Sequence, residues 1–233
     1  MNLPKHAISS LLIALLLPVI PSAAQEERQV KLQFVTFPAY SGEKPLELYS
    51  GEGESIPIEL PSTALSRVYT LKGVSSCILG QTETDDEGNS KFTKFGGGPL
   101  LNSDEQVILV LRKGGDASEG LTLIPFSNDA SGFTGGRYLM MNASTVDIAG
   151  QLGTDKFLIS PNKHTLLAPK PSRAEGDRKY LNIKIFFRKG DTTQNFYSNI
   201  WRYSDRARNM VFIYHDPHTK QLRTQTIRNY PER

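Results

Sequence analysis

Apolar and polar residues alternate with a period of two over much of this chain. The alternation is clearest in three segments, 30–34, 56–60 and 181–185, where Val, Leu, Ile or Phe occupies every second position. A period of two predicts strands with one buried face. A short, continuously apolar run over 107–111 instead predicts a strand that is buried on both faces.

Turn-forming residues separate these segments. The chain contains 19 Gly and 14 Pro, spread along its length, and no segment carries a clean apolar stripe at helical spacing. Many short strands without a long helix predict an all-β protein. We expect two tandem immunoglobulin-like β-sandwich units, or alternatively one continuous sandwich that both units share.

Two stretches of the chain resemble each other at a constant offset of 100 residues. Residues 46–61 and 146–161 carry similar or identical residues at six positions and end at Pro61 and Pro161. Arg112-Lys113-Gly114 also resembles Arg188-Lys189-Gly190. An internal duplication explains these matches, and chance similarity between strand-and-turn sequences is the alternative.

The N-terminus has the pattern of a secretory signal peptide. Lys5 precedes an apolar stretch over 7–20, and Ser22-Ala23-Ala24 offers the small residues that a signal peptidase recognises. The apolar stretch is shorter than the roughly 20 residues that span a bilayer. We therefore expect a cleaved signal peptide over residues 1–24, a first sandwich unit over 25–130, a second over 131–233, and no membrane span after cleavage.

The chain resembles a loose group of exported bacterial all-β proteins of unknown function. The residues that carry the resemblance are Arg137–Ser144, Ala149–Gly153, Trp201-Arg202-Tyr203 and Arg208–Phe212. The resemblance implies an exported all-β fold in the periplasm or outside the cell, and it implies no catalytic residue.

Few residues suggest catalysis or metal binding. The chain has no nucleophile elbow, no zincin helix and no P-loop, so we predict no catalytic residues and no cofactor. His215, Asp216 and His218 are the best metal-like cluster, although Asp216-Pro217 is also typical of a turn between two strands. The single Cys77 is expected to be a small buried residue. Asn142-Ala143-Ser144 matches a glycosylation sequon, which matters only in a eukaryotic secretory pathway.

The charge distribution suggests a binding surface. The whole chain has a formal net charge of +3, but residues 25–149 hold 10 Lys/Arg against 17 Asp/Glu, and residues 150–233 hold 16 against 7. Cations interleaved with aromatic residues can hold an anionic partner. Docking of the two oppositely charged units on each other, and a merely solvated surface, are the alternatives. The candidate ligand-binding residues are Lys184, Arg188, Trp201, Arg202, Arg206 and Arg208.

These observations predict a non-catalytic binding or structural protein of the bacterial cell envelope. Its partner would be an anionic envelope component or another protein, and not nucleic acid, which an exported protein rarely meets. A hydrolase acting on envelope polymers and a metal-binding accessory protein are the alternative functions.

Overall fold

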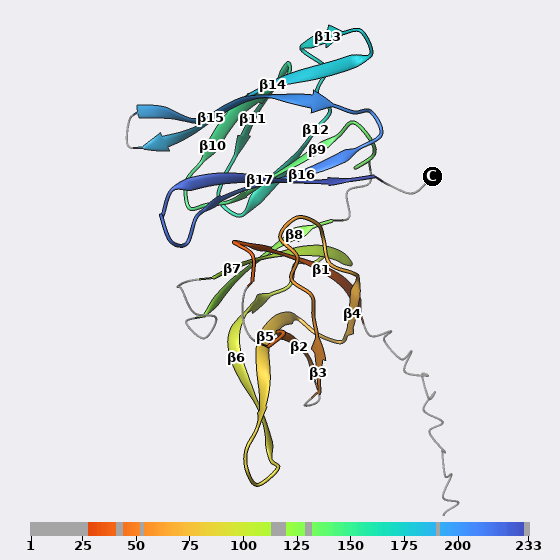
Figure 1. Ribbon diagram of the computed structural model, residues 1–233, viewed down its shortest axis with the longest axis vertical. Helices are drawn as coiled ribbons and strands as arrows, with labels where there is room; N and C mark the ends of the chain where they lie inside the picture. Colours follow the sequence, from red (N-terminus) through yellow and green to blue (C-terminus); the bar gives the residue numbers. More distant parts are fainter. Residues whose placement is uncertain are drawn as a thin grey trace, which may run out of the picture.

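A computed structural model gives the fold (Figure 1). It describes residues 28–40, 44–51, 54–112, 120–128, 132–189 and 192–230, so the predicted signal peptide over 1–24 lies outside the described residues. The described residues form seventeen strands and no helix, which confirms the predicted all-β class. Among them there is accordingly no helix of the length and apolarity that crossing a membrane requires.

The first eight strands form one curled sheet, which we call the first half. Its strand order is β3-β2-β5-β6-β8-β7-β1-β4. The strands are β1 (Gln29–Phe37), β2 (Glu47–Gly51), β3 (Glu54–Pro57), β4 (Tyr69–Lys72), β5 (Ser76–Thr84), β6 (Ser90–Pro99), β7 (Glu105–Arg112) and β8 (Leu121–Ser127).

The remaining nine strands form two separate sheets, which together are the second half. One has the order β12-β9-β16-β17, and the other has the order β11-β10-β14, with β13 and β15 also paired to β14. The strands are β9 (Tyr138–Ala143), β10 (Ile148–Leu152), β11 (Asp155–Ile159), β12 (Lys163–Leu167), β13 (Arg173–Glu175), β14 (Arg178–Lys189), β15 (Thr192–Tyr203), β16 (Arg208–His215) and β17 (Leu222–Asn229).

The two halves use the same strand order. The run β4-β1-β7-β8 corresponds to β12-β9-β16-β17, and β3-β2-β5-β6 corresponds to β11-β10-β14-β15. Each corresponding pair has the same direction, including the parallel pairs β1–β7 and β9–β16. The similar segments 46–61 and 146–161 lie at matching places in this scheme. Arg112 and Arg188 do not, because β7 corresponds to β16 and β14 to β5.

The halves differ in how their two runs of strands join. In the first half, β6 pairs with β8 at Gly96 and Leu121, and this pairing makes one continuous eight-stranded sheet. In the described part of the second half, no pairing joins the corresponding strands β15 and β17. An immunoglobulin sandwich consists of two antiparallel sheets, so the parallel pairs at the centre of each half are a difference from it. The predicted tandem immunoglobulin-like arrangement is not confirmed.

The sheets stack in layers (Figure 1). Three apolar cores lie between and within these layers. One core fills the curl of the first half, and another lies between the two sheets of the second half. The third lies between the halves, where the β4-β1-β7-β8 region faces the β12-β9-β16-β17 sheet. This explains why the run 107–111 is apolar throughout: side chains on one face of β7 enter the core of the first half, and those on the other face enter the shared core.

Aromatic rings cross the boundary between the halves. Phe37 of β1 lies 5.5 Å from Phe212 and 5.3 Å from Tyr214, both of β16, measured between ring centroids. Phe126 of β8 lies 6.3 Å from Phe212. Each ion pair found among the described residues joins two residues of the same half. Apolar packing therefore joins the halves, rather than attraction between their opposite charges.

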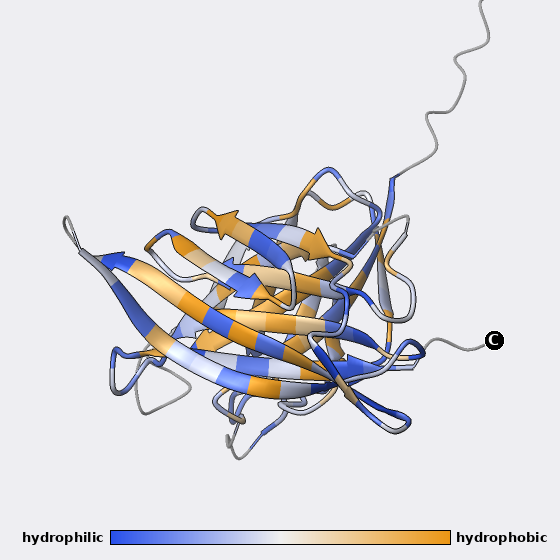
Figure 2. Cartoon of the chain, turned by 90° about the horizontal axis from the view of Figure 1, so that it is seen from above, coloured by the Kyte–Doolittle hydropathy of each residue, from blue (hydrophilic) through white to orange (hydrophobic). Residues whose placement is uncertain are grey.

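The sheet of β11, β10, β14, β13 and β15, which we call the outer sheet, has one buried and one solvent face; the β12-β9-β16-β17 sheet, which faces the first half, is the inner sheet. Leu181, Ile183 and Ile185 of β14 are buried, while Asn182 and Lys184 are exposed, as the alternation predicts. Viewed from above, the strands of the molecule show alternating hydrophobic and hydrophilic residues (Figure 2). This solvent face is available to carry binding residues.

Two residues discussed in the sequence analysis, Cys77 and Asn142, have buried side chains. Cys77 lies in the core of the first half, where burial raises the pKa of its thiol to about 12. The side-chain amide of Asn142 is fully buried and donates to the carbonyls of Val146 and Ile159, both at 2.8 Å. Its Oδ1 accepts from the backbone N–H and the hydroxyl of Ser144. The sequon asparagine is therefore a structural residue inside the folded chain.

Candidate functional site

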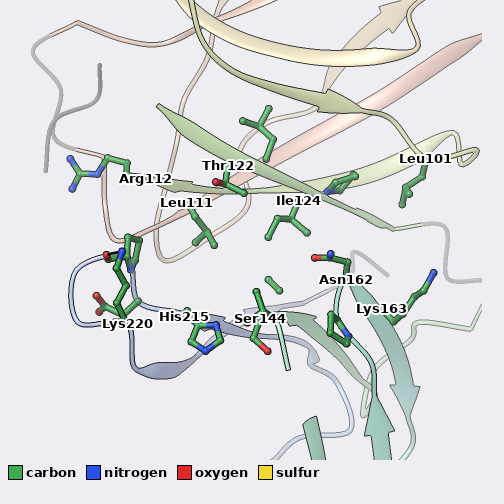
Figure 3. A pocket seen from close by; sticks show the side chains of 17 residues that line it. Leu101, Leu111, Arg112, Thr122, Ile124, Ser144, Asn162, Lys163, His215 and Lys220 are labelled. Atoms are coloured by element: carbon green, nitrogen blue, oxygen red, sulfur yellow. Dashed lines mark hydrogen bonds between the residues drawn. The ribbon is translucent and has the colours of Figure 1, made fainter. Parts of the chain in front are cut away.

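A groove of about 850 Å³ opens between the two halves (Figure 3). Leu111 and Ile124 point into it from the first half, and Ser144 and His215 line its opposite wall. The groove is mainly apolar, with cations among its lining residues. These are Arg112, Lys163 and Lys220.

The metal-like cluster of the sequence lies at this groove, with His215 at the end of β16 and Asp216 and His218 in the turn that follows. The Asp216 carboxylate accepts from the backbone N–H groups of Thr219 and His218, both at 2.9 Å. These hydrogen bonds hold the pKa of Asp216 below its usual value, and the bond from Thr219 has the largest effect. Partial burial lowers the pKa of His215. Among the described residues, no three His, Cys, Asp or Glu side chains gather as a metal site requires.

We expect the double substitution of His215 and His218 by alanine to leave both metal content and melting temperature nearly unchanged. His218 is exposed in the turn and His215 is half-buried at the end of β16, so we expect a change in the free energy of unfolding close to the usual limit for surface positions, about 0.5 kcal/mol each. Asp216→Ala is the matched control and should be more destabilising, by about 1 kcal/mol, because it leaves two N–H groups of the turn without their acceptor. Metal analysis of protein purified without a histidine tag, together with thermal unfolding, checks this. A stoichiometric metal that the double variant loses would contradict it.

A second, smaller pocket lies at one end of the outer sheet and gathers positive charge. It measures about 470 Å³, and we call it the basic pocket. It is formed by the start of β14, the end of β15, the loop from β15 to β16, and β17. Its lining residues are Asp177, Lys179, Arg202, Tyr203, Ser204, Asp205, Arg206, Arg228 and Tyr230.

The strand pairing explains how these cations meet. Lys179 of β14 pairs with Tyr203 of β15, so these two side chains share one face of the hairpin, and Arg202 lies at the same end of the hairpin on the opposite face. Arg228 of β17 reaches across from the other sheet, and its Nη2 donates to the carbonyl of Arg202 at 3.4 Å. Arg206 belongs to the loop that leads from the outer to the inner sheet. None of these four cations makes an ion pair with a carboxylate in the described part of the chain.

The structure brings two of the six predicted ligand-binding residues together, namely Arg202 and Arg206. Trp201 points to the opposite face of β15 from Arg202, because neighbouring residues of a strand alternate between its faces. Its ring stacks on Tyr138, with centroids 6.0 Å apart, and its Nε1 donates to the Tyr197 hydroxyl at 3.0 Å. Trp201 therefore packs on the core beneath the sheet.

The other three predicted residues lie elsewhere. Lys184 and Arg188 are exposed further along β14, with Arg188 roughly 30 Å from Lys179 at about 3.3 Å per residue. Arg208 begins β16, and its guanidinium carbon lies 5.4 Å from the centre of the Phe133 ring, near the boundary between the halves.

Sequence reasoning did not select Lys179 or Arg228 as site residues. Lys179 lies next to β15 only because β14 and β15 form a long hairpin, and Arg228 reaches the pocket from a different sheet. The Gly190-Asp191 pair, which has the composition of a two-residue hairpin turn, was the signal in the sequence for that hairpin.

No protein-family model matches the chain, and no curated protein matches it in sequence. The geometry of the two pockets is therefore the evidence for what they bind.

Proposed function

We propose that the protein is an exported, non-catalytic binding protein of the bacterial cell envelope, which holds an anionic partner at its basic pocket. The observation that carries this proposal is the convergence of Lys179, Arg202, Arg206 and Arg228 on one cavity. Export rests on the N-terminal sequence and places the protein in the periplasm or outside the cell. Its partner there would be an acidic envelope component or another protein.

The charge of the basic pocket favours an anion over a cation or a neutral ligand. Its four cations outnumber its two carboxylates, Asp177 and Asp205. Arginine offers a planar fork of donors that suits carboxylate and phosphate groups. Tyr203 and Tyr230 add hydroxyl donors and ring surface beside these cations. Such a pocket binds by attraction and hydrogen bonding, and it needs no bond-breaking chemistry.

We further propose that the chain consists of two copies of one β-sandwich unit, divided between residues 130 and 131. The shared strand order, the matching directions of its pairs and the similar segments 46–61 and 146–161 support this duplication. The units are immunoglobulin-like in size and in having two runs of strands packed face to face. Sandwich folds of this kind often serve as interaction modules.

Arg202→Ala combined with Arg206→Ala should weaken binding of heparin, used as a model polyanion. Exposed ion pairs contribute roughly 0.2–1 kcal/mol each, so the double variant should bind up to about 30-fold more weakly. Binding by the unchanged protein should also fall steeply with added salt, since charges are screened beyond about 10 Å at 0.1 M. Affinity measured at several salt concentrations checks both effects.

The matched control removes two exposed lysines of the first half, Lys91 and Lys94 of β6. It changes the net charge by the same amount but leaves the basic pocket intact, so heparin affinity should hardly change. Equal losses in the two double variants would show that binding depends on total charge, which would overturn the proposal. Melting temperatures of both variants should stay close to that of the unchanged protein.

A further inference from the structure

β15 is a long strand with one unpaired edge. It pairs with β14 from Thr192 to Tyr203, and no strand in the described part of the chain pairs with its other side. Twelve residues at about 3.3 Å each give an edge of roughly 40 Å. Unpaired strand edges present rows of backbone donors and acceptors to other chains.

Two hydrogen bonds show which backbone groups face this edge. The N–H of Ile200 donates to the side chain of Asn199 at 2.7 Å rather than to β14. The carbonyl of Arg202 accepts from Arg228. Because residues alternate in direction along an antiparallel ladder, Ser198 faces the same way. Ser198, Ile200 and Arg202 therefore direct their backbone groups outward.

The first half shows how the corresponding edge is closed. There β6, the counterpart of β15, pairs with β8. In the second half, half-buried aromatic side chains lie along the open edge instead and pack on the core beneath it. They are Tyr197, Trp201 and Tyr203. Alternate residues of an added strand would cover the parts of these rings that remain exposed.

β15 also carries few of the features that protect edge strands. Such strands are usually guarded by Lys, Pro, inward charges or bulges. β15 contains no Lys or Pro, and Arg202 is its one charged residue. The side chain of Ile200 is 51% exposed on the solvent face of the same stretch. The register shift in the β14–β15 pair, at Ile185/Phe186, leaves Phe196 between the paired residues Asn195 and Tyr197, so it lies just before Ser198 and outside the segment 198–202.

We propose that β15 binds an extended, acidic segment of a partner polypeptide as an additional strand. Backbone hydrogen bonds to Ser198, Ile200 and Arg202 would provide affinity, as in other cases of strand addition. They would replace the bonds that Ile200 now makes to the Asn199 side chain and Arg202 to Arg228. The segment would carry its acidic residues where it passes Arg202 and enters the basic pocket. This charge complementarity selects an acidic polypeptide, and the inference rests on the proposed function of that pocket as an anion site.

A synthetic ten-residue peptide of alternating valine and threonine, with a glutamate pair at each end, serves as the probe. We expect this peptide to bind the full chain and to slow amide hydrogen exchange at Ser198, Ile200 and Arg202. Ile200→Pro removes an N–H that is not part of the β14 ladder, and edge strands tolerate proline when that position faces solvent. It should weaken peptide binding at least about tenfold, the effect of 1.4 kcal/mol. Ile200→Thr, which keeps the N–H, is the matched control and should bind nearly as well as the unchanged protein.

Peptide variants separate strand addition from simple charge attraction. A peptide with alternate backbone nitrogens methylated keeps its glutamates but loses its donors, so it should not bind. Equal binding of the methylated peptide, or of Ile200→Pro, would overturn strand addition and leave the anion-binding proposal standing. Conversely, the protein could bind the parent peptide but neither the methylated peptide nor heparin. That result would support strand addition at β15 and overturn the proposed function of the basic pocket. If the parent peptide does not bind, the inference is overturned. It is also overturned if the protein self-associates and Ile200→Pro abolishes this, because the edge would then bind a second copy of this chain.

Discussion

Replacing Phe212 by alanine should lower the free energy of unfolding by about 3–5 kcal/mol. Phe212 is fully buried and contacts the rings of Phe37 and Phe126, which belong to the first half. The substitution would leave a cavity in the core that joins the halves. Phe212→Leu keeps most of the volume and should cost less than about 1.5 kcal/mol.

Two natural reporters show whether the halves lose stability together. Trp201 is the one tryptophan of the chain and lies in the second half, while the one cysteine, Cys77, lies in the core of the first. Tryptophan fluorescence and thiol labelling across a denaturant series therefore follow the two halves separately. Phe212→Ala should move both transitions to lower denaturant. A shift of the fluorescence transition alone would show that the halves unfold independently.

Asn142→Ala should destabilise the protein by about 3 kcal/mol or more. The substitution removes the side-chain donor to the Ile159 carbonyl and the acceptor of the Ser144 backbone N–H, while the Val146 carbonyl still accepts from the Ser144 hydroxyl at 3.2 Å. Each buried polar group left unsatisfied costs about 1–3 kcal/mol. Denaturant unfolding measures the change.

Ser144→Ala provides the comparison for this buried network. It removes one hydroxyl but keeps both hydrogen bonds that the side-chain amide of Asn142 donates, so it should lower the free energy of unfolding by about 1 kcal/mol. A loss below 1 kcal/mol for Asn142→Ala would show that the network contributes little to folding.

The sequence predicted which faces of the strands are buried but not which strands are neighbours. The alternation at 181–185 gave the correct inward residues, because only one face of β14 meets a core. The apolar run at 107–111 was correctly assigned to a strand buried on both faces. The parallel pairs β1–β7 and β9–β16 join segments far apart in sequence, and no local pattern encodes such a pairing.

The candidate site was predictable in part for the same reason. A cluster of basic residues in the last third of the chain pointed to Arg202 and Arg206. Treating Trp201 as part of the same surface ignored the alternation of side chains along a strand. Lys179 and Arg228 enter the basic pocket through hairpin register and sheet stacking, which depend on tertiary structure.

The parallel pair at the centre of each half affects the order in which the chain can fold. Lys31 pairs with Glu105, 74 residues further along the chain. Bringing these residues together costs loop-closure entropy before any contact between β1 and β7 can offset that cost. Contacts of such high sequence separation make folding slow. During synthesis the first half can complete its sheet before β16 exists, and its apolar face around Phe37 then has no partner. Association between such unfinished chains through this face would compete with folding until the second half covers it.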